Sequence, residues 1–325
     1  MMGAATHRYR SPYRGADHRH RWGAPDLLGF CKKKEIDMKP VSLFIIRSIV
    51  FCLLQVQTGI ADEQGLLWQI QGKNTDAYLF GTIHSEDRRV TQLPEPVETS
   101  FNRAEILMLE VSLDQLTTAT VATRMLQQAD GSLSKQMGKS LAEEAAVAMQ
   151  SRGVPPEVTD LMQPWAVVMT LSAPRQLSGE FLDKQLYNRA IADGKRFQPL
   201  EYPDEQLSVF TTLTLDEQKS LLRSVLDEYR TYPRMYERLT EAYLERDLDT
   251  LAEISFANPI SDDPALQKKF MAGMLTGRNH RMLERMEPLF SQGKVFIAVG
   301  ALHLVGAEGL ISLLRQRGYK LKLLY

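Results

Sequence analysis

VFIAVGALHL, residues 295–304, is the stretch of sequence that decides the fold. Its apolar β-formers end in a Gly-x-x-His motif that runs from Gly300 to His303, and a glycine-rich turn and a helical pattern follow. A continuous apolar run of this kind is typical of a strand that is buried on both faces. Open α/β sheets bind their ligands at the carboxyl ends of such strands. We therefore expect His303 to lie at the ligand-binding edge of a buried sheet.

A second stretch, AYLFGTIH at residues 77–84, has the same pattern near the other end of the chain. It ends at His84 and continues into a loop, a helical segment at about 96–104 and an apolar strand at 105–111. Glycine three residues before each histidine allows neighbouring backbone to come close. We predict an α/β fold whose central mixed sheet is built from two strand–GxxH–helix–strand repeats.

Residues 113–290 have a different pattern and are predicted to form a mostly helical insert between the two repeats. The tetrapeptides at 140–143 and 214–217 match the capping box that starts many helices. Apolar residues at helical spacing predict long helices at 236–254 and 264–289. We expect this insert to cover the site.

Three carboxylates need a physical explanation. Glu110 lies inside the apolar run 107–111, where an unpaired carboxylate is costly, so it requires a cation, a metal ion or a hydrogen-bond network. Glu201 lies near the end of a short apolar run at 197–202, which has the position of a strand in a βαβ pattern. Asp183 lies at the start of a helical segment, and the helix dipole is a sufficient reason for a carboxylate there.

The histidines at the strand ends predict a metal centre. Two imidazoles with one to three carboxylates suit Mn(II), Co(II), Fe(II) or Zn(II) and leave positions open for water and substrate. We predict that His84, His303 and Glu201 are ligands of a divalent metal ion and that Glu110 is the general base. His280 lies between two arginines and is expected to be a surface histidine.

The charge of the chain is unevenly distributed. Residues 1–61 hold 10 Lys and Arg but only 4 Asp and Glu, whereas residues 62–325 hold 29 basic and 36 acidic residues. An acidic body argues against nucleic acid as a partner, because binding to phosphates requires a basic surface. Both cysteines lie within residues 1–61, so the remainder has neither a cysteine nucleophile nor a cysteine-based zinc site.

Residues 38–61 have the features of a secretory signal peptide: a basic start, a short apolar run and small residues at the end. Residues 1–37 are then upstream sequence or a disordered extension. Arg47 interrupts the apolar run and leaves it too short to span a bilayer, so we expect no stable transmembrane segment in the mature chain, 62–325. This interpretation predicts a periplasmic or secreted protein, and the alternative is an uncleaved N-terminal anchor.

Seven ordered motifs resemble those of the TraB/GumN/TIKI family. They are YLFGTIH (78–84), LMLEV (107–111), QPWAV (163–167), FLDKQL (181–186), PLEYPDEQL (199–207), GRN (277–279) and VGALHLVGAEGL (299–310). The resemblance covers about residues 65–325, and its motifs lie at both ends and in the middle of that range.

The resemblance implies an active site. In this family the two GxxH motifs, a glutamate after the first and an Arg-Asn pair before the second are regarded as the active-site residues. These positions fall on His84, Glu110, Arg278, Asn279 and His303. Animal TIKI members are described as metalloproteases that depend on Mn or Co, and the wider superfamily includes erythromycin esterases and ChaN-like proteins.

The sequence therefore favours a metal-dependent hydrolase of the cell envelope, acting on an amide or ester bond in a peptide or small molecule. It contains no GxSxG, HExxH, Walker A or GxGxxG motif. Two alternatives remain open. The first is a binding protein of the ChaN type that holds haem or another ligand, and the second is a noncatalytic envelope factor.

Overall fold

The computed structural model describes residues 64–72, 75–126, 131–175, 178–257, 260–261 and 263–325, which lie in one compact unit. The predicted extension 1–37 and signal peptide 38–61 fall outside the described residues and stay predictions. Within the described ranges, no helix has the length and apolar character needed to cross a membrane.

A six-stranded mixed sheet forms the centre of this unit, with the strand order β4-β3-β5-β2-β1-β6. The strands are β1 (Leu67–Gly72), β2 (Thr75–Thr82), β3 (Ile106–Leu109), β4 (Arg196–Pro199), β5 (Val295–Gly300) and β6 (Lys320–Leu323). The four strands from β4 to β2 pair in parallel, whereas β1 is antiparallel to both of its neighbours. The prediction of an α/β fold with a mixed sheet is confirmed.

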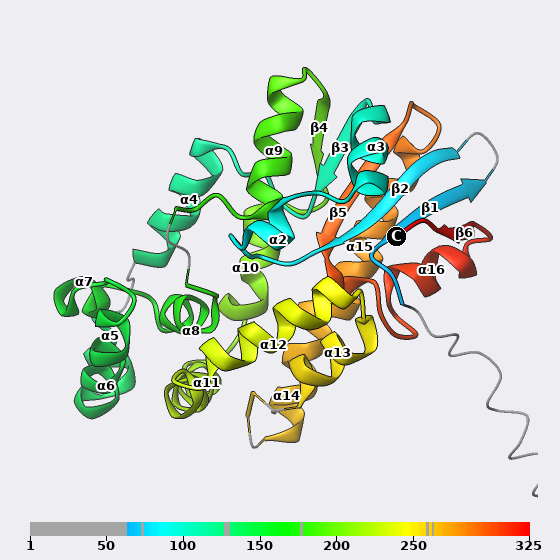
Figure 1. Cartoon of the computed structure of the whole chain (residues 1–325). Helices are drawn as coiled ribbons and strands as arrows, with labels where there is room; N and C mark the ends of the chain where they lie inside the picture. Colours follow the sequence, from blue (N-terminus) through cyan, green and yellow to red (C-terminus); the bar gives the residue numbers. More distant parts are fainter. Residues whose placement is uncertain (1–63, 73–74, 127–130, 176–177, 258–259, 262) are drawn as a thin grey trace, which may run out of the picture. The chain divides into compact units, whose positions relative to one another are not determined.

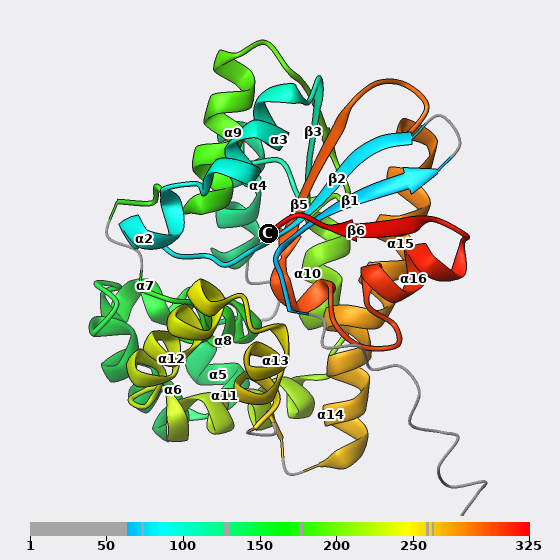
Figure 2. The same cartoon turned by 45° about the vertical axis from the view of Figure 1, so that its right-hand side comes forward.

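Helices cover both faces of the sheet and fill the insert. They are α2 (Arg88–Thr91), α3 (Glu95–Arg103), α4 (Gln115–Leu126), α5 (Leu133–Met137), α6 (Lys139–Gln150), α7 (Pro156–Asp160), α8 (Pro164–Ser172), α9 (Leu182–Ala192), α10 (Pro203–Thr211), α11 (Leu215–Glu228), α12 (Tyr232–Glu245), α13 (Leu248–Phe256), α14 (Pro264–Met271), α15 (Gly277–Met286) and α16 (Leu310–Gln316). Helices α3 and α9 lie on one face of the sheet, and α15 and α16 lie on the other (Figures 1 and 2). The remaining helices of the insert lie beyond the carboxyl ends of β2 and β5 (Figure 1).

Strands β2 and β5 lie side by side in the middle of the sheet, so the two GxxH motifs leave it at the same edge. In their parallel register Gly81 is opposite Val299, and Thr82 is opposite Gly300. A Cβ atom at Gly81 would lie 2.8 Å from the Cδ1 atom of Leu304 and 3.2 Å from Ala301. The close approach expected of this glycine is therefore present.

The strands that follow the two motifs occupy different places in the sheet. Strand β3 pairs in parallel with β5 near the centre, whereas β6 pairs with β1 at the edge. Helix α16 ends before Gly318, whose φ of 89° is the left-handed conformation that glycine adopts without steric cost. This turn directs β6 back to the sheet.

Two predicted long helices are interrupted. The segment predicted at 236–254 is two helices, because α12 ends at Arg246 with a φ of 62° and the Asp247 side chain caps α13 by accepting from the Thr250 N–H at 2.9 Å. The segment predicted at 264–289 contains a turn of π-helix at Ala272–Thr276. Such turns often occur at functional sites, and this one directly precedes α15, which carries Arg278.

One predicted capping box is present and the other is absent. The side chain of Thr214 accepts from the Glu217 N–H, and the Glu217 carboxylate accepts from the Thr214 N–H in return. The prediction of a capping box at 140–143 is wrong, because α6 begins at Lys139 and its N-cap is Gly138.

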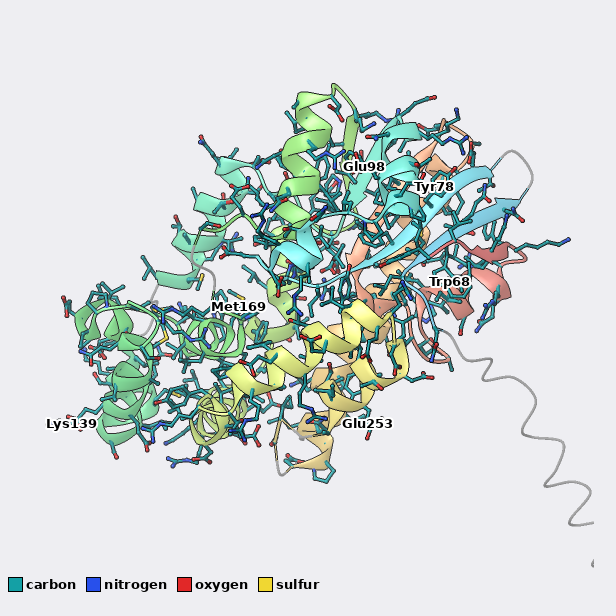
Figure 3. All side chains as sticks on the ribbon, viewed as in Figure 1. Trp68, Tyr78, Glu98, Lys139, Met169 and Glu253 are labelled. Carbon is teal, nitrogen blue, oxygen red and sulfur yellow. The ribbon has the colours of Figure 1, made fainter. Side chains whose placement is uncertain are left out.

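Two apolar clusters hold the unit together. One contains the buried strands with the helices packed on them, and the other lies among α5, α6, α8 and α11. Trp68 and Tyr78 lie on the sheet, whereas Met169 lies in the helical insert (Figure 3). The insert thus has a core of its own beyond the sheet edge.

An ion pair links α10 to α15 next to the site. Arg285 of α15 donates two hydrogen bonds, 2.6 and 2.7 Å long, to the carboxylate of Glu205 in the first turn of α10. Arg285 thereby lowers the pKa of Glu205 to about 2 from its ordinary value of 4.5, with a further contribution from the Tyr202 N–H and against the opposing effect of burial. This contact fixes the start of α10, which carries Gln206.

We expect Glu205→Gln to lower the free energy of unfolding by about 1 kcal/mol at pH 7, because water screens this partly exposed pair. A carboxylate with a depressed pKa in the folded state stabilises it above the unfolded-state pKa and loses that effect as the pH falls. The difference between wild type and variant should therefore shrink as the pH falls from 4.5 toward 2. Urea unfolding at pH 7 and pH 3.5 measures it, and a constant or growing difference would contradict the linkage.

Candidate active site

His84 and His303 converge at the carboxyl edge of the sheet although they lie near opposite ends of the described chain. His84 follows β2, and His303 ends a short 3-10 turn, Ala301–His303, directly after β5. The Glu110 carboxylate raises the pKa of both imidazoles, and the charge of His84 lowers the pKa of His303. The two imidazoles therefore belong to one electrostatic environment, as the parallel pairing of β2 and β5 requires.

Glu110 directly follows β3 and lies at the centre of this environment. Its Oε1 atom accepts the Gly300 N–H at 2.7 Å and lies 3.7 Å from the Nε2 atom of His303. Its Oε2 atom accepts from the side chains of Arg278 at 2.6 Å and Gln206 at 3.2 Å. We expected this carboxylate to need a cation, a metal ion or a hydrogen-bond network. It has a cation, Arg278, and also hydrogen bonds from Gln206 and from the Gly300 N–H.

Arg278 joins the fully buried carboxylate of Glu201 to the largely buried carboxylate of Glu110. Its Nη2 atom lies 2.6 Å from Glu110 and 2.7 Å from Glu201, and its Nε atom donates to Glu201 at 2.8 Å. The other oxygen of Glu201 accepts from Arg281 at 3.0 Å. The Glu201 side chain is fully buried. Arg278 is thus occupied by contacts within the protein and holds the ends of β3 and β4 to α15.

Asn279 fixes the orientation of His303. Its Nδ2 atom donates to the backbone carbonyl of Glu308 at 2.7 Å, so its Oδ1 atom is the acceptor that meets His303 Nδ1 at 2.6 Å. The Nδ1 atom of His303 therefore carries a proton, and in the neutral ring Nε2 has a free lone pair. Burial lowers the pKa of His303, and the Arg278 charge acts in the same direction while Glu110 opposes it.

Asp183 forms an ion pair with His84, although the sequence did not assign Asp183 to the site. Thr82 donates to its Oδ1 atom at 2.8 Å, and its Oδ2 atom lies 3.2 Å from the Nδ1 atom of His84. The direction of this contact does not satisfy a hydrogen bond, so Oδ2 is a buried side-chain oxygen without a hydrogen-bond partner among the described residues. The position of Asp183 in the first turn of α9 therefore explains this buried carboxylate only in part, and its contacts with Thr82 and His84 are a second reason.

The carboxylates control the charge of His84. Partial loss of hydration lowers the pKa of His84, as does the Arg278 charge, but the nearby carboxylates of Asp183 and Glu110 outweigh both effects and raise the pKa to about 9. The ring is half exposed, with 52% of the side chain accessible, and packs edge-on against Phe181. His84 is therefore the accessible member of the pair, whereas His303 is buried.

Replacing Asp183 by asparagine should lower the pKa of His84 from about 9 toward its ordinary value of 6.5, since the main charge that raises it is removed. NMR titration of the His84 ring in chelator-treated protein measures this shift. Asp193→Asn, at the exposed end of the same helix, is the matched control and should leave the His84 titration unchanged. An unchanged pKa in Asp183→Asn would show that the contact does not control His84.

The environment of Glu110 favours a role other than general base. Burial raises the pKa of the Glu110 carboxyl, but Arg278, the two histidines and the Gly300 N–H outweigh it and hold the pKa well below its usual range. A carboxylate with so low a pKa is a weak proton acceptor at neutral pH. It remains an anion that can pair with a cation.

The donor set fits a divalent ion only in part. His303 donates from Nδ1 to an oxygen acceptor, the arrangement that metal-ligating histidines usually show, and His84 has a carboxylate oxygen 3.2 Å from its Nδ1 atom. Glu201, which we predicted as a ligand, is not available in this arrangement because both its oxygens contact arginines. Within the described ranges, no three side chains among His, Cys, Asp and Glu form a group that could hold a metal ion as they stand.

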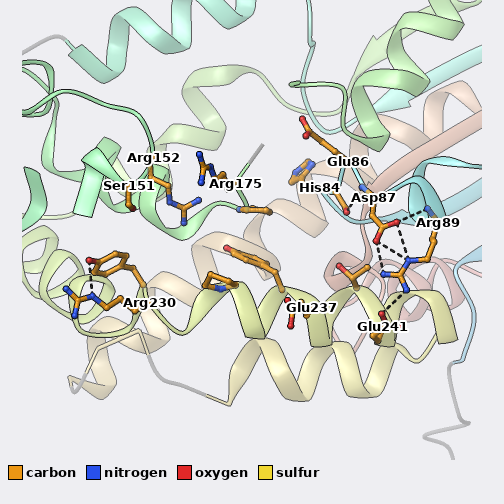
Figure 4. Close-up of a pocket in the computed structure, with 16 residues that line it drawn as sticks. His84, Glu86, Asp87, Arg89, Ser151, Arg152, Arg175, Arg230, Glu237 and Glu241 are labelled. Atoms are coloured by element: carbon orange, nitrogen blue, oxygen red, sulfur yellow. Dashed lines mark hydrogen bonds and ion pairs between the residues drawn. The ribbon is translucent and has the colours of Figure 1, made fainter. Parts of the chain in front are cut away.

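A cavity of about 590 Å³ opens beside His84. The loop after β2, the end of α6, the loop after α8 and the start of α12 line it. Figure 4 shows His84 with Glu86, Asp87 and Arg89 on one side of the cavity and Arg152 on the opposite side. His280, in contrast, is half exposed and contacts Glu308 at 2.6 Å, as expected of a surface histidine.

Comparison with known proteins supports one family assignment. Residues 66–323 match the model of the TraB/PrgY/gumN family. Two similar proteins, from Shigella flexneri and from Escherichia coli (strain K12), each bear the name "Uncharacterized protein YbaP" and are 23% identical over 254 residues. Those alignments cover 74% of this chain and 89% of each relative. No solved structure matches the chain.

Proposed function

The chain belongs to the TraB/PrgY/gumN family, and we propose that it is a metal-dependent hydrolase that cleaves an amide or ester bond at the centre formed by His84, His303 and Glu110. One observation carries the proposal. Two imidazoles from opposite ends of the described chain share the largely buried carboxylate of Glu110 as a neighbour; Asn279 accepts a hydrogen bond from Nδ1 of His303, and Nδ1 of His84 lies 3.2 Å from the carboxylate of Asp183. This leaves both Nε2 atoms available to a ligand.

In the proposed centre, His84, His303 and the Oε1 atom of Glu110 would hold the ion, with Glu110 in the place first assigned to Glu201. Ligand bonds of about 2.0–2.2 Å bring two ligands of one ion to about 3–3.6 Å from each other. The 3.7 Å between His303 Nε2 and Glu110 Oε1 is close to that separation. His84, whose ring is half exposed, would be the third ligand.

The surrounding residues orient these three groups. Asn279 keeps the proton of His303 on Nδ1, Asp183 faces Nδ1 of His84, and Arg278 holds the Oε2 atom of Glu110. Such outer contacts fix the direction and the protonation state of the ligating atoms. A divalent ion in this position supplies a Lewis acid that polarises a carbonyl group and lowers the pKa of water. Arg278 acts in this scheme as a positioning residue, because carboxylates already occupy its donors.

The cavity beside His84 gives a substrate access to the centre. Its volume of about 590 Å³ lies within the range of small-molecule and short-peptide sites. We further propose that the protein acts in the periplasm or outside the cell, on the basis of the signal-peptide pattern at 38–61. N-terminal sequencing of protein from the cell envelope tests this, and recovery of residues 1–37 from cytosol would contradict it.

A peptide-library cleavage screen tests the proposed activity. We expect the purified protein to cleave library members after addition of Mn(II) or Co(II) and to lose this activity after chelation. His280→Ala is the matched control, because it removes a surface imidazole that makes no contact with the centre. Bound metal without any cleavage of peptides or esters would favour a binding protein, and equal cleavage with and without metal would contradict metal dependence.

A further inference from the structure

The two sides of the cavity beside His84 differ in charge. On the His84 side, the single arginine of the lining, Arg89, lies 2.8 Å from Asp87 and 2.9 Å from Glu241, so its charge is neutralised. On the other side lie Arg152, Arg175 and Arg230 (Figure 4). This second group of three is called the arginine cluster below.

Three separate segments bring the arginine cluster together. Arg152 follows α6, Arg175 lies in the loop after α8, and Arg230 lies between α11 and α12. Arg152 donates to the Leu171 carbonyl at 2.7 Å, and Arg230 donates to the Tyr229 hydroxyl at 3.1 Å. Over the described ranges, no ion pair joins any of the three to a carboxylate.

Like charges repel, and none of these three guanidinium groups has a carboxylate partner among the described residues, although Glu237 also lines the cavity. Guanidinium groups bind carboxylates and phosphates through paired, charge-assisted hydrogen bonds. Tyr236 and Pro233 line the cavity with the arginine cluster, which adds apolar surface to its polar groups. Apolar walls with a few directed polar groups are typical of ligand sites.

We propose that the arginine cluster is an oxyanion-binding subsite, so that the substrate carries a carboxylate or phosphate group on the side that faces away from His84. That this anion belongs to a substrate which is cleaved rests on the proposed hydrolase function. Binding of the anion by the arginine cluster does not depend on catalysis. A substrate would bind with its acidic group at the arginine cluster, and the bond to be cleaved would then lie toward His84 and Glu110.

Binding of labelled peptides tests the subsite. The probes are three dansylated tetrapeptide amides, one of four glutamates, one of four glutamines and one that contains phosphoserine between glutamines. We expect the glutamate or the phosphoserine probe to bind at least tenfold more tightly than the glutamine probe by fluorescence anisotropy. Which of the two anions binds more tightly identifies the carboxylate or the phosphate as the preferred group.

The variants use the most exposed members of the cluster. Arg175→Gln with Arg230→Gln should weaken anionic-probe binding by about tenfold and leave the glutamine probe unchanged, since both side chains are exposed and folding does not depend on them. Adding Arg152→Gln should weaken it further. Arg234→Gln, an exposed arginine on α12 outside the cavity lining, is the charge-matched control and should have no effect.

Equal binding of all three probes, or the same affinity in the double variant as in wild type, would overturn the subsite. The outcome is separable from that of the hydrolase proposal, because His303→Ala should retain the anion preference while losing cleavage. Cleavage without any preference for anionic peptides would overturn the subsite alone, and an anion preference without any cleavage would overturn the hydrolase alone.

Discussion

Replacing Arg278 by alanine is expected to lower the free energy of unfolding by about 3–5 kcal/mol, because it leaves the buried carboxylate of Glu201 and the largely buried carboxylate of Glu110 without their shared cation. Arg278 contacts Glu110 at 2.6 Å and Glu201 at 2.7 Å, and only 7% of its side chain is accessible. Urea unfolding at neutral pH measures the loss.

Two further variants separate the buried charge from simple loss of packing. Arg281→Ala removes a partly exposed arginine that contacts only one of the two carboxylates, so it should cost about 1 kcal/mol. Combining Arg278→Met with Glu110→Gln and Glu201→Gln removes all three charges and should recover part of the stability. A loss below about 1 kcal/mol in Arg278→Ala would contradict its role as the shared cation.

Replacing His303 by alanine is expected to reduce kcat/KM by at least about 100-fold, since even loss of a group that orients a metal ligand has effects of that order. His303 is buried, and its Nε2 atom lies 3.7 Å from Glu110. Among the described residues, His84 is the one other imidazole at this site. Cleavage of the best library peptide at saturating Mn(II) measures the loss.

The control for this variant is His280→Ala, which should keep full activity. His280 lies one residue after Asn279, but its ring contacts Glu308 rather than the centre. His303→Gln keeps more of the side-chain volume and should be as inactive as His303→Ala if the imidazole itself is required. Full activity in either His303 variant would contradict a catalytic centre at this position.

The sheet and the meeting of the two motifs were predictable because they depend on local patterns. Apolar runs that end in Gly-x-x-His specify two buried strands, and parallel pairing of β2 with β5 then brings His84 and His303 to one edge. The strand around residues 197–199 was also predictable from its place after a helix and a turn. The roles predicted for the residues within the site stay predictions.

The partners of the carboxylates could not be read from the sequence, because they are contacts between segments far apart in the chain. Glu201 has the position of a metal ligand, yet Arg278 and Arg281 on α15 take both of its oxygens. Asp183 has the pattern of an ordinary helix start, yet α9 brings it to His84. What sets Asp183 apart from an ordinary residue at a helix start is that it is buried. Burial depends on the folded chain, so the sequence alone did not reveal it.

Cobalt binding tests the central claim, that His84 and His303 hold one ion together, most directly. The account predicts that wild-type protein binds one Co(II) per chain with visible absorption bands of a nitrogen-ligated ion. It also predicts that His84→Ala and His303→Ala each lose these bands, while His280→Ala keeps them. Retention of the wild-type bands in either His84→Ala or His303→Ala would contradict a shared centre.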